Sequence, residues 1–180
     1  MLPAMSSLER NRQFHGLDLE PVVHQPKQLD MEFYTDGSSR ESYESYMIGK
    51  KIGSGAYAQV MIGIHKVLNA KVAIKIYDKL KLLEPNRRKS VKREIKILER
   101  LEHVGISRLY EAFDTHKQVY LIMEYMDGGS LYSYLKTFPN RQMPEDEAKF
   151  LFKQIIQALA YCHSRCVTHR DIKLENILLD

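Results

Sequence analysis

The sequence has 180 residues, of which 44% are hydrophobic and 28% charged, and its formal net charge is +4. This size and hydrophobic content predict one globular domain, alone or with a tail. No membrane span is expected, because no apolar run approaches the roughly 18 residues that a membrane helix needs.

The positive charge is concentrated after residue 45. Residues 1–45 contain four Lys or Arg and eight Asp or Glu, a net charge of −4, which leaves +8 for residues 46–180. The net positive charge of residues 46–180 favours an anionic ligand. Phosphate is a better candidate than nucleic acid, because no basic stripe carries interleaved aromatic residues. We therefore expect no nucleic-acid partner.

The first 45 residues show little periodicity and contain Pro3, Pro21, Pro26 and a polar run from Thr35 to Ser42. Such a composition is typical of a flexible tail. From Tyr46 the sequence consists of short runs that are rich in Ile, Val and Tyr. These runs predict five strands, joined by short connections that favour antiparallel neighbours. Their ranges are Tyr46–Ile52, Gln59–Ile64, Lys71–Tyr77, Leu109–Phe113 and Val119–Tyr125.

Three segments have helical spacing. Residues 85–102 carry Val91, Ile95, Leu98 and Leu101 on one stripe and Lys or Arg elsewhere, which predicts one amphipathic helix. After Gly128-Gly129, residues 130–138 predict a short helix, and Pro144 with two acidic residues marks the start of a longer one over 145–163. The fold class is therefore α+β, with a five-stranded antiparallel sheet and one helix, a glycine-containing hinge and the start of a helical lobe.

Only two cysteines are present, Cys162 and Cys166. They cannot build a disulfide framework and are read as reduced thiols, which predicts a cytoplasmic or nuclear protein. With His163 and His169 they imitate the spacing of zinc ligands. We do not expect a zinc site there, because no second ligand cluster exists.

The segment Gly53–Val60 lies between the first two predicted strands. Its paired glycines allow backbone amides to approach a polyphosphate. A simple turn is the alternative, and the third glycine of the usual pattern is replaced by Ala58.

Two charged residues are predicted to pair. Lys75 ends the run Val72-Ala73-Ile74-Lys75 inside the third strand, and Glu94 lies on the apolar stripe of the first helix. A charge directed at a core needs a partner, so we expect an ion pair between them. Such a pair either holds the lysine toward nucleotide phosphates or is purely structural.

A third motif follows the long helix. Residues 169–176 read His-Arg-Asp-Ile-Lys-Leu-Glu-Asn. Asp171 can accept a hydroxyl proton and Asn176 can bind a metal. Taken in order, the three motifs resemble those of eukaryotic-type protein kinases, over residues 46–180 without a gap.

The resemblance implies roles for these residues. Lys75, paired with Glu94, is expected to bind the α- and β-phosphates of ATP, Asp171 to act as catalytic base, Lys173 to steady the transferred phosphoryl group and Asn176 to hold magnesium. His169 and Arg170 are expected to shape their loop. The expected ATP-binding residues also include those that cover the phosphates (Gly53, Ser54, Gly55, Ala56, Tyr57, Ala58), the gatekeeper and hinge (Met123, Glu124, Met126) and those that sandwich adenine (Ile52, Val60, Ala73, Leu178).

Lys173 resembles the serine/threonine class, and Ile172–Asp180 resembles the calcium/calmodulin-dependent and AMP-activated kinase-like group. The resemblance implies transfer of the ATP γ-phosphoryl group to a Ser or Thr hydroxyl of a protein substrate, and it names no regulatory partner. It divides the chain into a tail (1–45), a small lobe (46–125), a hinge (126–129) and the start of a large lobe (130–180).

Kinases continue into an Asp-Phe-Gly magnesium site, which is not found before Asp180. We therefore expect a fragment that is inactive and self-associating when expressed as residues 1–180. The alternative is a non-catalytic, nucleotide-binding or regulatory homologue.

Overall fold

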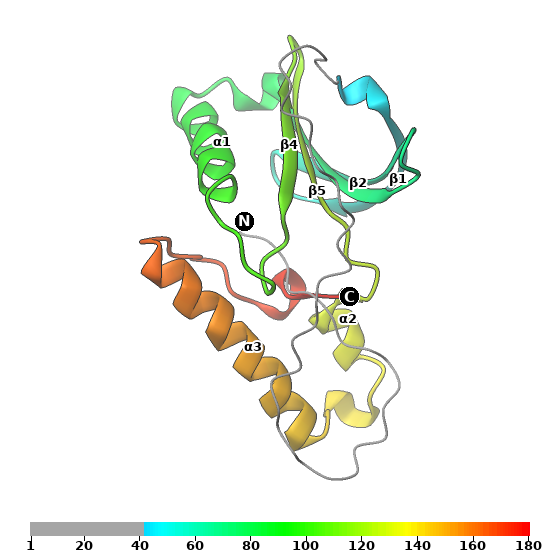
Figure 1. Cartoon of the computed structure of the whole chain (residues 1–180), viewed down its shortest axis with the longest axis vertical. Helices are drawn as coiled ribbons and strands as arrows, with labels where there is room; N and C mark the ends of the chain where they lie inside the picture. Colours follow the sequence, from blue (N-terminus) through cyan, green and yellow to red (C-terminus); the bar gives the residue numbers. More distant parts are fainter. Residues whose placement is uncertain (1–41) are drawn as a thin grey trace.

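The computed structural model describes residues 42–180. The predicted tail therefore lies outside the described residues, apart from its last four positions. Within these, Tyr43–Ser45 form a 3-10 helix, and the Tyr43 ring stacks on Tyr120 of the sheet with 4.6 Å between ring centroids. A sheet with one long helix forms one part of the molecule, and two further helices form the other (Figure 1).

The sheet has five strands in the order β1-β2-β3-β5-β4, and every neighbouring pair is antiparallel. This confirms the predicted five-stranded antiparallel sheet, with small changes at the strand ends. The strands are β1 (Tyr46–Ser54), β2 (Ala58–His65), β3 (Lys71–Asp78), β4 (Leu109–Asp114) and β5 (Gln118–Glu124).

Each face of the sheet has its own apolar cluster, because side chains alternate between faces along a strand. Tyr77 of β3 and Leu121 of β5 pack toward the long helix, whereas Ile74 and Ile122 pack on the opposite face. Lys75 shares the face of Tyr77, since the two are two residues apart. Alternation therefore places the predicted phosphate-binding lysine beneath the long helix.

That helix, α1 (Pro85–Leu98), begins with Pro at its first position and follows the 3-10 helix Lys79–Leu82. It ends four residues earlier than the predicted end at Glu102. Leu101, which was expected on its apolar stripe, is 5% exposed but belongs to a different cluster, with Ala158 and Cys162. The chain leaves the helix axis after Leu98 because Leu101 is buried against the helix of the second part.

The short helix of the second part, α2 (Leu131–Leu135), is shorter than the predicted range 130–138. Ser130 is its N-cap and accepts a hydrogen bond from the Ser133 N–H. A 3-10 helix, Pro139–Arg141, follows. A further 3-10 helix, Leu174–Asn176, lies near the end of the chain.

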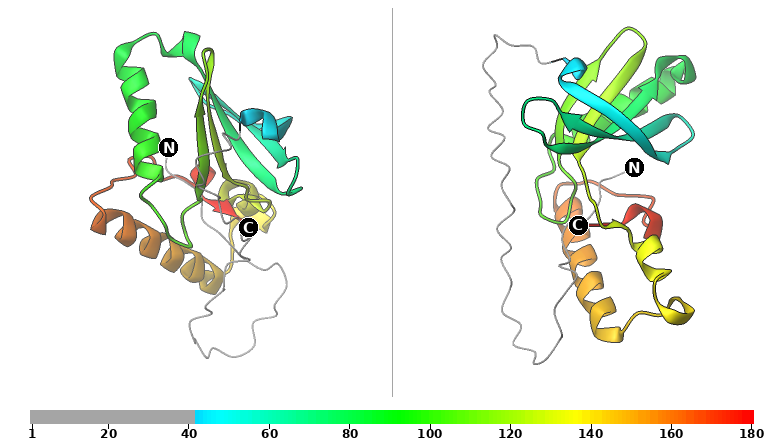
Figure 2. Two further views of the ribbon diagram at one scale, coloured as in Figure 1. Left: turned by 45° about the horizontal axis from the view of Figure 1, so that its top comes forward. Right: turned by 90° about the vertical axis from the view of Figure 1, so that its right-hand side faces the viewer.

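A two-stranded sheet was not predicted. Its strands are β6 (Gly129–Ser130) and β7 (Leu178–Leu179). Gly128 lies directly against β7, since a Cβ there would approach the Leu179 carbonyl oxygen to 2.6 Å. This pairing joins the residues after the sheet to the end of the motif loop, and both views of Figure 2 show that end beside the start of α2.

The long helix of the second part is α3 (Glu145–Ser164), which has three acidic residues in its first turn and confirms the prediction within one residue. Its apolar arc is only partly covered. Phe150, Phe152 and Ile156 are 42%, 62% and 46% exposed. No helix among residues 42–180 is both long and apolar enough to cross a bilayer.

Candidate functional site

The ion pair predicted between β3 and α1 is present. Lys75 Nζ lies 2.6 Å from Glu94 Oε1, and the two side chains are 8% and 17% exposed. Both charges are therefore largely withdrawn from water. A buried charge is tolerated only when it is paired, so each side chain fixes the position of the other.

A third residue completes this arrangement and was missed by the sequence analysis. The Tyr77 hydroxyl donates to Glu94 Oε2 at 2.6 Å, and Lys75 Nζ lies 5.0 Å from the centre of the Tyr77 ring. Burial, followed by the charge and hydrogen bond of Glu94, raises the pKa of Tyr77 far above its usual value, so the hydroxyl stays a donor. The available signal was its spacing, since Tyr77 follows Lys75 by two residues and shares its face of β3.

The glycine-containing loop joins β1 to β2. Gly53 pairs with Val60 and Ser54 with Gln59, and the Gly55 N–H donates to the Ala58 carbonyl at 2.8 Å. A tight hairpin therefore presents Ala56 and Tyr57 at its tip. The Tyr57 ring contacts the Arg87 guanidinium of α1, with 4.4 Å between the guanidinium carbon and the ring centre.

Ala58 replaces the third glycine without backbone strain. Among the described residues, Ala58 is not one of those with positive φ, and its side chain packs on the cluster formed with Tyr77 and Leu121. A methyl group is therefore accommodated at the start of β2, and the hairpin closes in its presence.

The residues expected around adenine are distributed over three strands and the end of the chain. Val60 pairs with Lys75, and Ala73, which precedes Lys75 by two residues on β3, pairs with Met123. Ile52 is 44% exposed at the edge strand. Leu178 pairs with Ser130 in the small second sheet rather than with the main sheet.

Glu124 and Met126 lie at the exit of β5. The Glu124 N–H donates to the Arg108 carbonyl at 2.9 Å, and its own carbonyl accepts from the Ser107 hydroxyl at 3.3 Å. The N–H of Glu124 is thus occupied, while its carbonyl keeps a second lone pair. Met126 is 6% exposed. Burial raises the pKa of the Glu124 carboxyl.

The motif loop after α3 gathers three of the predicted catalytic and metal-binding side chains. Asp171 Oδ2 lies 3.0 Å from Lys173 Nζ and accepts a hydrogen bond from Asn176 Nδ2 at 2.8 Å. The Asp171 N–H donates to His169 Nδ1 at 3.2 Å. Arg170 has φ of 66°, the left-handed region, which turns the chain so that its neighbours converge.

These contacts act on the Asp171 carboxyl. Its side chain is 51% exposed. The hydrogen bonds from Lys173 and then Asn176 lower its pKa below the ordinary value. Asp171 is therefore an ionised acceptor at neutral pH. Within residues 42–180, no hydrogen bond or ion pair joins this loop to Lys75 or Glu94.

Metal binding was expected at Asn176. Because its amide nitrogen donates to Asp171, its amide oxygen is the atom left for a cation. Among the described residues, no group of three His, Cys, Asp or Glu side chains is placed to hold a metal ion. Cys162 and Cys166 are free thiols, and Cys162 is buried.

Comparison with known proteins agrees with this geometry. The protein kinase domain model matches residues 46–180. The chain is 41% identical over 140 residues to CBL-interacting protein kinase 25 of Oryza sativa subsp. japonica, covering 76% of this chain and 27% of that protein. It is 41% identical over 152 residues to SNF1-related protein kinase catalytic subunit alpha KIN12 of Arabidopsis thaliana, covering 81% and 30%.

A third relative is Serine/threonine protein kinase OSK3 of Oryza sativa subsp. indica, 40% identical over 144 residues, with 80% of this chain and 28% of that protein covered. The chain thus spans about 30% of the length of the curated relatives that it matches. The match begins at Tyr46, the first residue of β1, and includes both the ion pair and the motif loop. The chain belongs to the protein kinase domain family, among relatives that are serine/threonine protein kinases.

Proposed function

We propose that the protein containing this chain binds ATP with magnesium and transfers the γ-phosphoryl group to a Ser or Thr hydroxyl of a protein substrate. The buried ion pair of Lys75 and Glu94 supports this most directly. A lysine that merely faced solvent on a strand would not need a carboxylate partner from a helix. The register also supports a phosphate contact, because Lys75 lies opposite Val60, the last residue of the glycine-containing segment.

On the nucleotide side, the hairpin between β1 and β2 covers the phosphates and Lys75 binds them. Gly53 and Gly55 leave the hairpin backbone open, because a Cβ on either residue would come no closer than 3.4 Å to its neighbours. The space there is thus available to a ligand. Ile52, Val60, Ala73 and Leu178 form the apolar surfaces for adenine, and Met123, which pairs with Ala73, is the gatekeeper.

Asn176 is the magnesium ligand that we propose in the described part of the chain. Its amide oxygen is a hard donor and suits the ion, and the remaining ligands would be nucleotide phosphates, water and other oxygen atoms. When bound, magnesium would supply positive charge beside the phosphates. Lys173 adds a positive charge beside Asp171, 3.0 Å away.

Asp171 is the proposed general base. Its lowered pKa keeps the carboxylate ionised and able to accept the proton of the substrate hydroxyl. Asn176 donates both to the Asp171 backbone carbonyl and to its carboxylate, which fixes the orientation of the carboxylate. We also propose the division into a small lobe (46–125), a hinge (126–129) and the start of a large lobe (130–180). The two free thiols support a cytoplasmic or nuclear location.

The test uses the full-length protein with ATP, magnesium and a serine-containing peptide. Asp171→Asn should lower kcat by about 10²- to 10⁴-fold, the usual worth of a general base, while nucleotide binding measured by fluorescence is retained. Asp146→Asn, an exposed aspartate in the first turn of α3, is the control. Unchanged turnover in Asp171→Asn would contradict the role of Asp171.

Lys75→Met should weaken ATP binding and lower turnover together. Lys71→Met is its matched control, since Lys71 is an exposed lysine of the same strand. Equal effects of the two lysine substitutions on ATP binding would contradict the proposed phosphate contact. Nucleotide binding without any transfer in the full-length protein would instead favour the non-catalytic homologue.

A further inference from the structure

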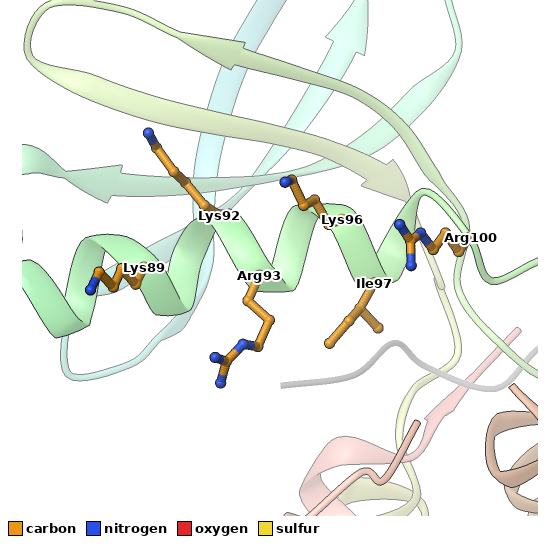
Figure 3. A pocket seen from close by; sticks show the side chains of 6 residues that line it. All are labelled: Lys89, Lys92, Arg93, Lys96, Ile97 and Arg100. Atoms are coloured by element: carbon orange, nitrogen blue, oxygen red, sulfur yellow. The ribbon is translucent and has the colours of Figure 1, made fainter. Parts of the chain in front are cut away.

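The outer surface of α1 carries a cluster of positive charges that the proposed catalysis does not use. We call this surface the basic face. It consists of Lys89, Lys92, Arg93 and Lys96 of α1 and of Arg100, two residues past the end of the helix, all exposed, which with Ile97 line a pocket of about 370 Å³ (Figure 3). The intervals of three and four residues place these side chains along one side of the helix.

The basic face is opposite the side of α1 that packs on the sheet. Val91 and Leu98 are buried there, 6% and 3% exposed. Each helical residue turns the direction of its side chain by about 100°, so Lys92 and Lys96 point away from the direction shared by Val91 and Leu98. A ligand on the basic face would therefore contact α1 without displacing the packing that holds Glu94.

The cations of the basic face have no acidic partner in the described part of the chain. None of the five takes part in an ion pair within residues 42–180. Two other arginines of α1 differ, since Arg87 pairs with Glu84 at 2.7 Å and Arg88 donates to the Leu82 carbonyl at 2.9 Å. Like charges one turn apart repel, so a counter-charge would stabilise this helix.

The sequence contains a segment of the complementary charge. Residues 18–36 hold five acidic residues and one lysine, a net charge of −4, and they lie outside the described residues. We propose that this acidic segment docks on the basic face of α1. Docking is intramolecular, so the effective concentration is in the millimolar range even though each exposed charge pair is weak.

The spacing of charges fits this pairing. In an extended segment Asp30 and Glu32 share one side and lie about 6.6 to 6.8 Å apart. Along the helix, Lys92 and Lys96 are separated by a rise of about 6 Å. An extended acidic segment that runs along α1 therefore places successive carboxylates beside successive turns of the basic face.

The connecting chain is long enough. Eleven residues lie between Asp30 and Ser42, where the described chain begins, and these twelve residue steps span at most about 40 Å. The first 3-10 helix and α1 are at opposite sides of the sheet (Figure 1). Tyr43 stacks on β5, which is one strand, about 5 Å, from the β4 edge of the sheet. Passing that edge, the layer about 10 Å away and the helix itself, about 11 Å thick, takes about 26 Å, so the acidic segment can reach the basic face.

Docking would affect the candidate site through α1. This consequence, unlike the docking itself, rests on the proposed function. A segment held across several turns of α1 would favour the position in which Glu94 meets Lys75, because a ligand stabilises the conformation that it binds best. The acidic segment would thus be a built-in support for the ATP-binding arrangement.

The experiment is zero-length carbodiimide cross-linking of the full-length protein, which joins carboxylates to lysine amines in contact, followed by mass spectrometry. We expect links from Asp30 or Glu32 to Lys92 or Lys96, and their yield should fall between 50 mM and 500 mM salt because exposed charges are screened. The readout needs neither ATP nor turnover, so it stands even if the proposed catalysis fails.

Charge reversal provides the specificity test. The variant with Lys92→Glu, Arg93→Glu and Lys96→Glu should lower the yield of cross-links from residues 18–36 to α1, measured at Lys89, by about fivefold or more, since several exposed pairs become repulsive. Docking should also protect the α1 amides from hydrogen exchange, and the charge reversal should remove this protection. Adding Asp30→Lys and Glu32→Lys to the reversed variant should restore it, because the two charge patterns are complementary again. The control reverses Lys66, Lys71 and Lys117, which are exposed elsewhere. Circular dichroism checks that each variant is folded.

Several results would overturn the proposal. Cross-links from residues 18–36 spread evenly over exposed lysines would mean that the segment has no preferred site. Links only between heavy- and light-isotope chains would assign the basic face to a second copy. Unchanged yield after reversal of the basic face, or an equal loss in the control, would show that its charges do not select the acidic segment.

Discussion

Removal of a single hydroxyl tests whether Tyr77 positions the ion pair. Tyr77→Phe keeps the ring, its packing with Leu121 and its contact with Lys75, and deletes only the donor to Glu94 Oε2. A hydrogen bond to a charged group contributes about 1.5 to 3 kcal/mol to stability. Because the Glu94 side chain is 17% exposed, water replaces part of the lost bond, and we expect a loss of about 1 to 2 kcal/mol.

A matched control exists on the other face of the sheet. Tyr46 is 4% exposed and its hydroxyl donates to the Glu111 carboxylate at 2.7 Å, away from Lys75 and Glu94. Tyr46→Phe should therefore lower the free energy of unfolding in urea by a similar amount without affecting the ion pair. Comparison of the two variants separates a loss of stability from a loss of positioning.

The assay is steady-state phosphorylation by the full-length protein at a temperature where both variants are folded. When Glu94 is held less firmly, Lys75 can also occupy a conformation in which it is not paired. A loss of about 1.4 kcal/mol in the free-energy difference between the two conformations lowers the paired population by up to tenfold. We expect kcat/KM for ATP to fall by about 3- to 10-fold in Tyr77→Phe and to stay within twofold in Tyr46→Phe, by the same population argument.

A double-mutant cycle gives the decisive comparison. Tyr77→Phe and Glu94→Gln should show less than additive losses in kcat/KM, because both act on one interaction. If Tyr77→Phe behaved like Tyr46→Phe, or if its effect simply added to that of Glu94→Gln, Tyr77 would be a packing residue and the positioning role would be refuted.

Three further predictions concern other parts of the molecule. Lys173→Ala removes the leading cause of the lowered Asp171 pKa, so the carboxyl should protonate at higher pH and the acid limb of the pH profile of kcat/KM should move upward; an unmoved limb would separate Lys173 from that titration. Gly128→Ala should destabilise the fold by more than about 2 kcal/mol in urea titration, because its Cβ meets the Leu179 backbone, whereas Gly129→Ala, with φ of 76° and open space, should cost about 1 to 2 kcal/mol; the reverse order would contradict the close approach. Residues 1–180 should self-associate in light scattering, and Phe152→Ser should reduce this, because that side chain is 62% exposed; a monomer before substitution would contradict it.

The sequence determined the features that depend on near neighbours. Alternation over Lys71–Tyr77 predicted a strand, and β3 was found there. The position of Glu94 on the apolar stripe of a helix predicted that its charge is turned inward and paired, and the partner was Lys75 at 2.6 Å. These predictions succeeded because strand and helix periods are set within a few residues, and because a buried charge has few possible partners.

The tertiary structure decided what depends on residues far apart in the chain. The pairing of Gly129 with Leu179 joins positions 50 residues apart, and neither two-residue strand has a period of its own. The end of α1 at Leu98 was set by the burial of Leu101 against α3, where the Glu102 N–H also meets the Tyr161 hydroxyl. Periodicity cannot report such contacts, because it records which face a side chain shares with its neighbours and not which distant surface covers that face.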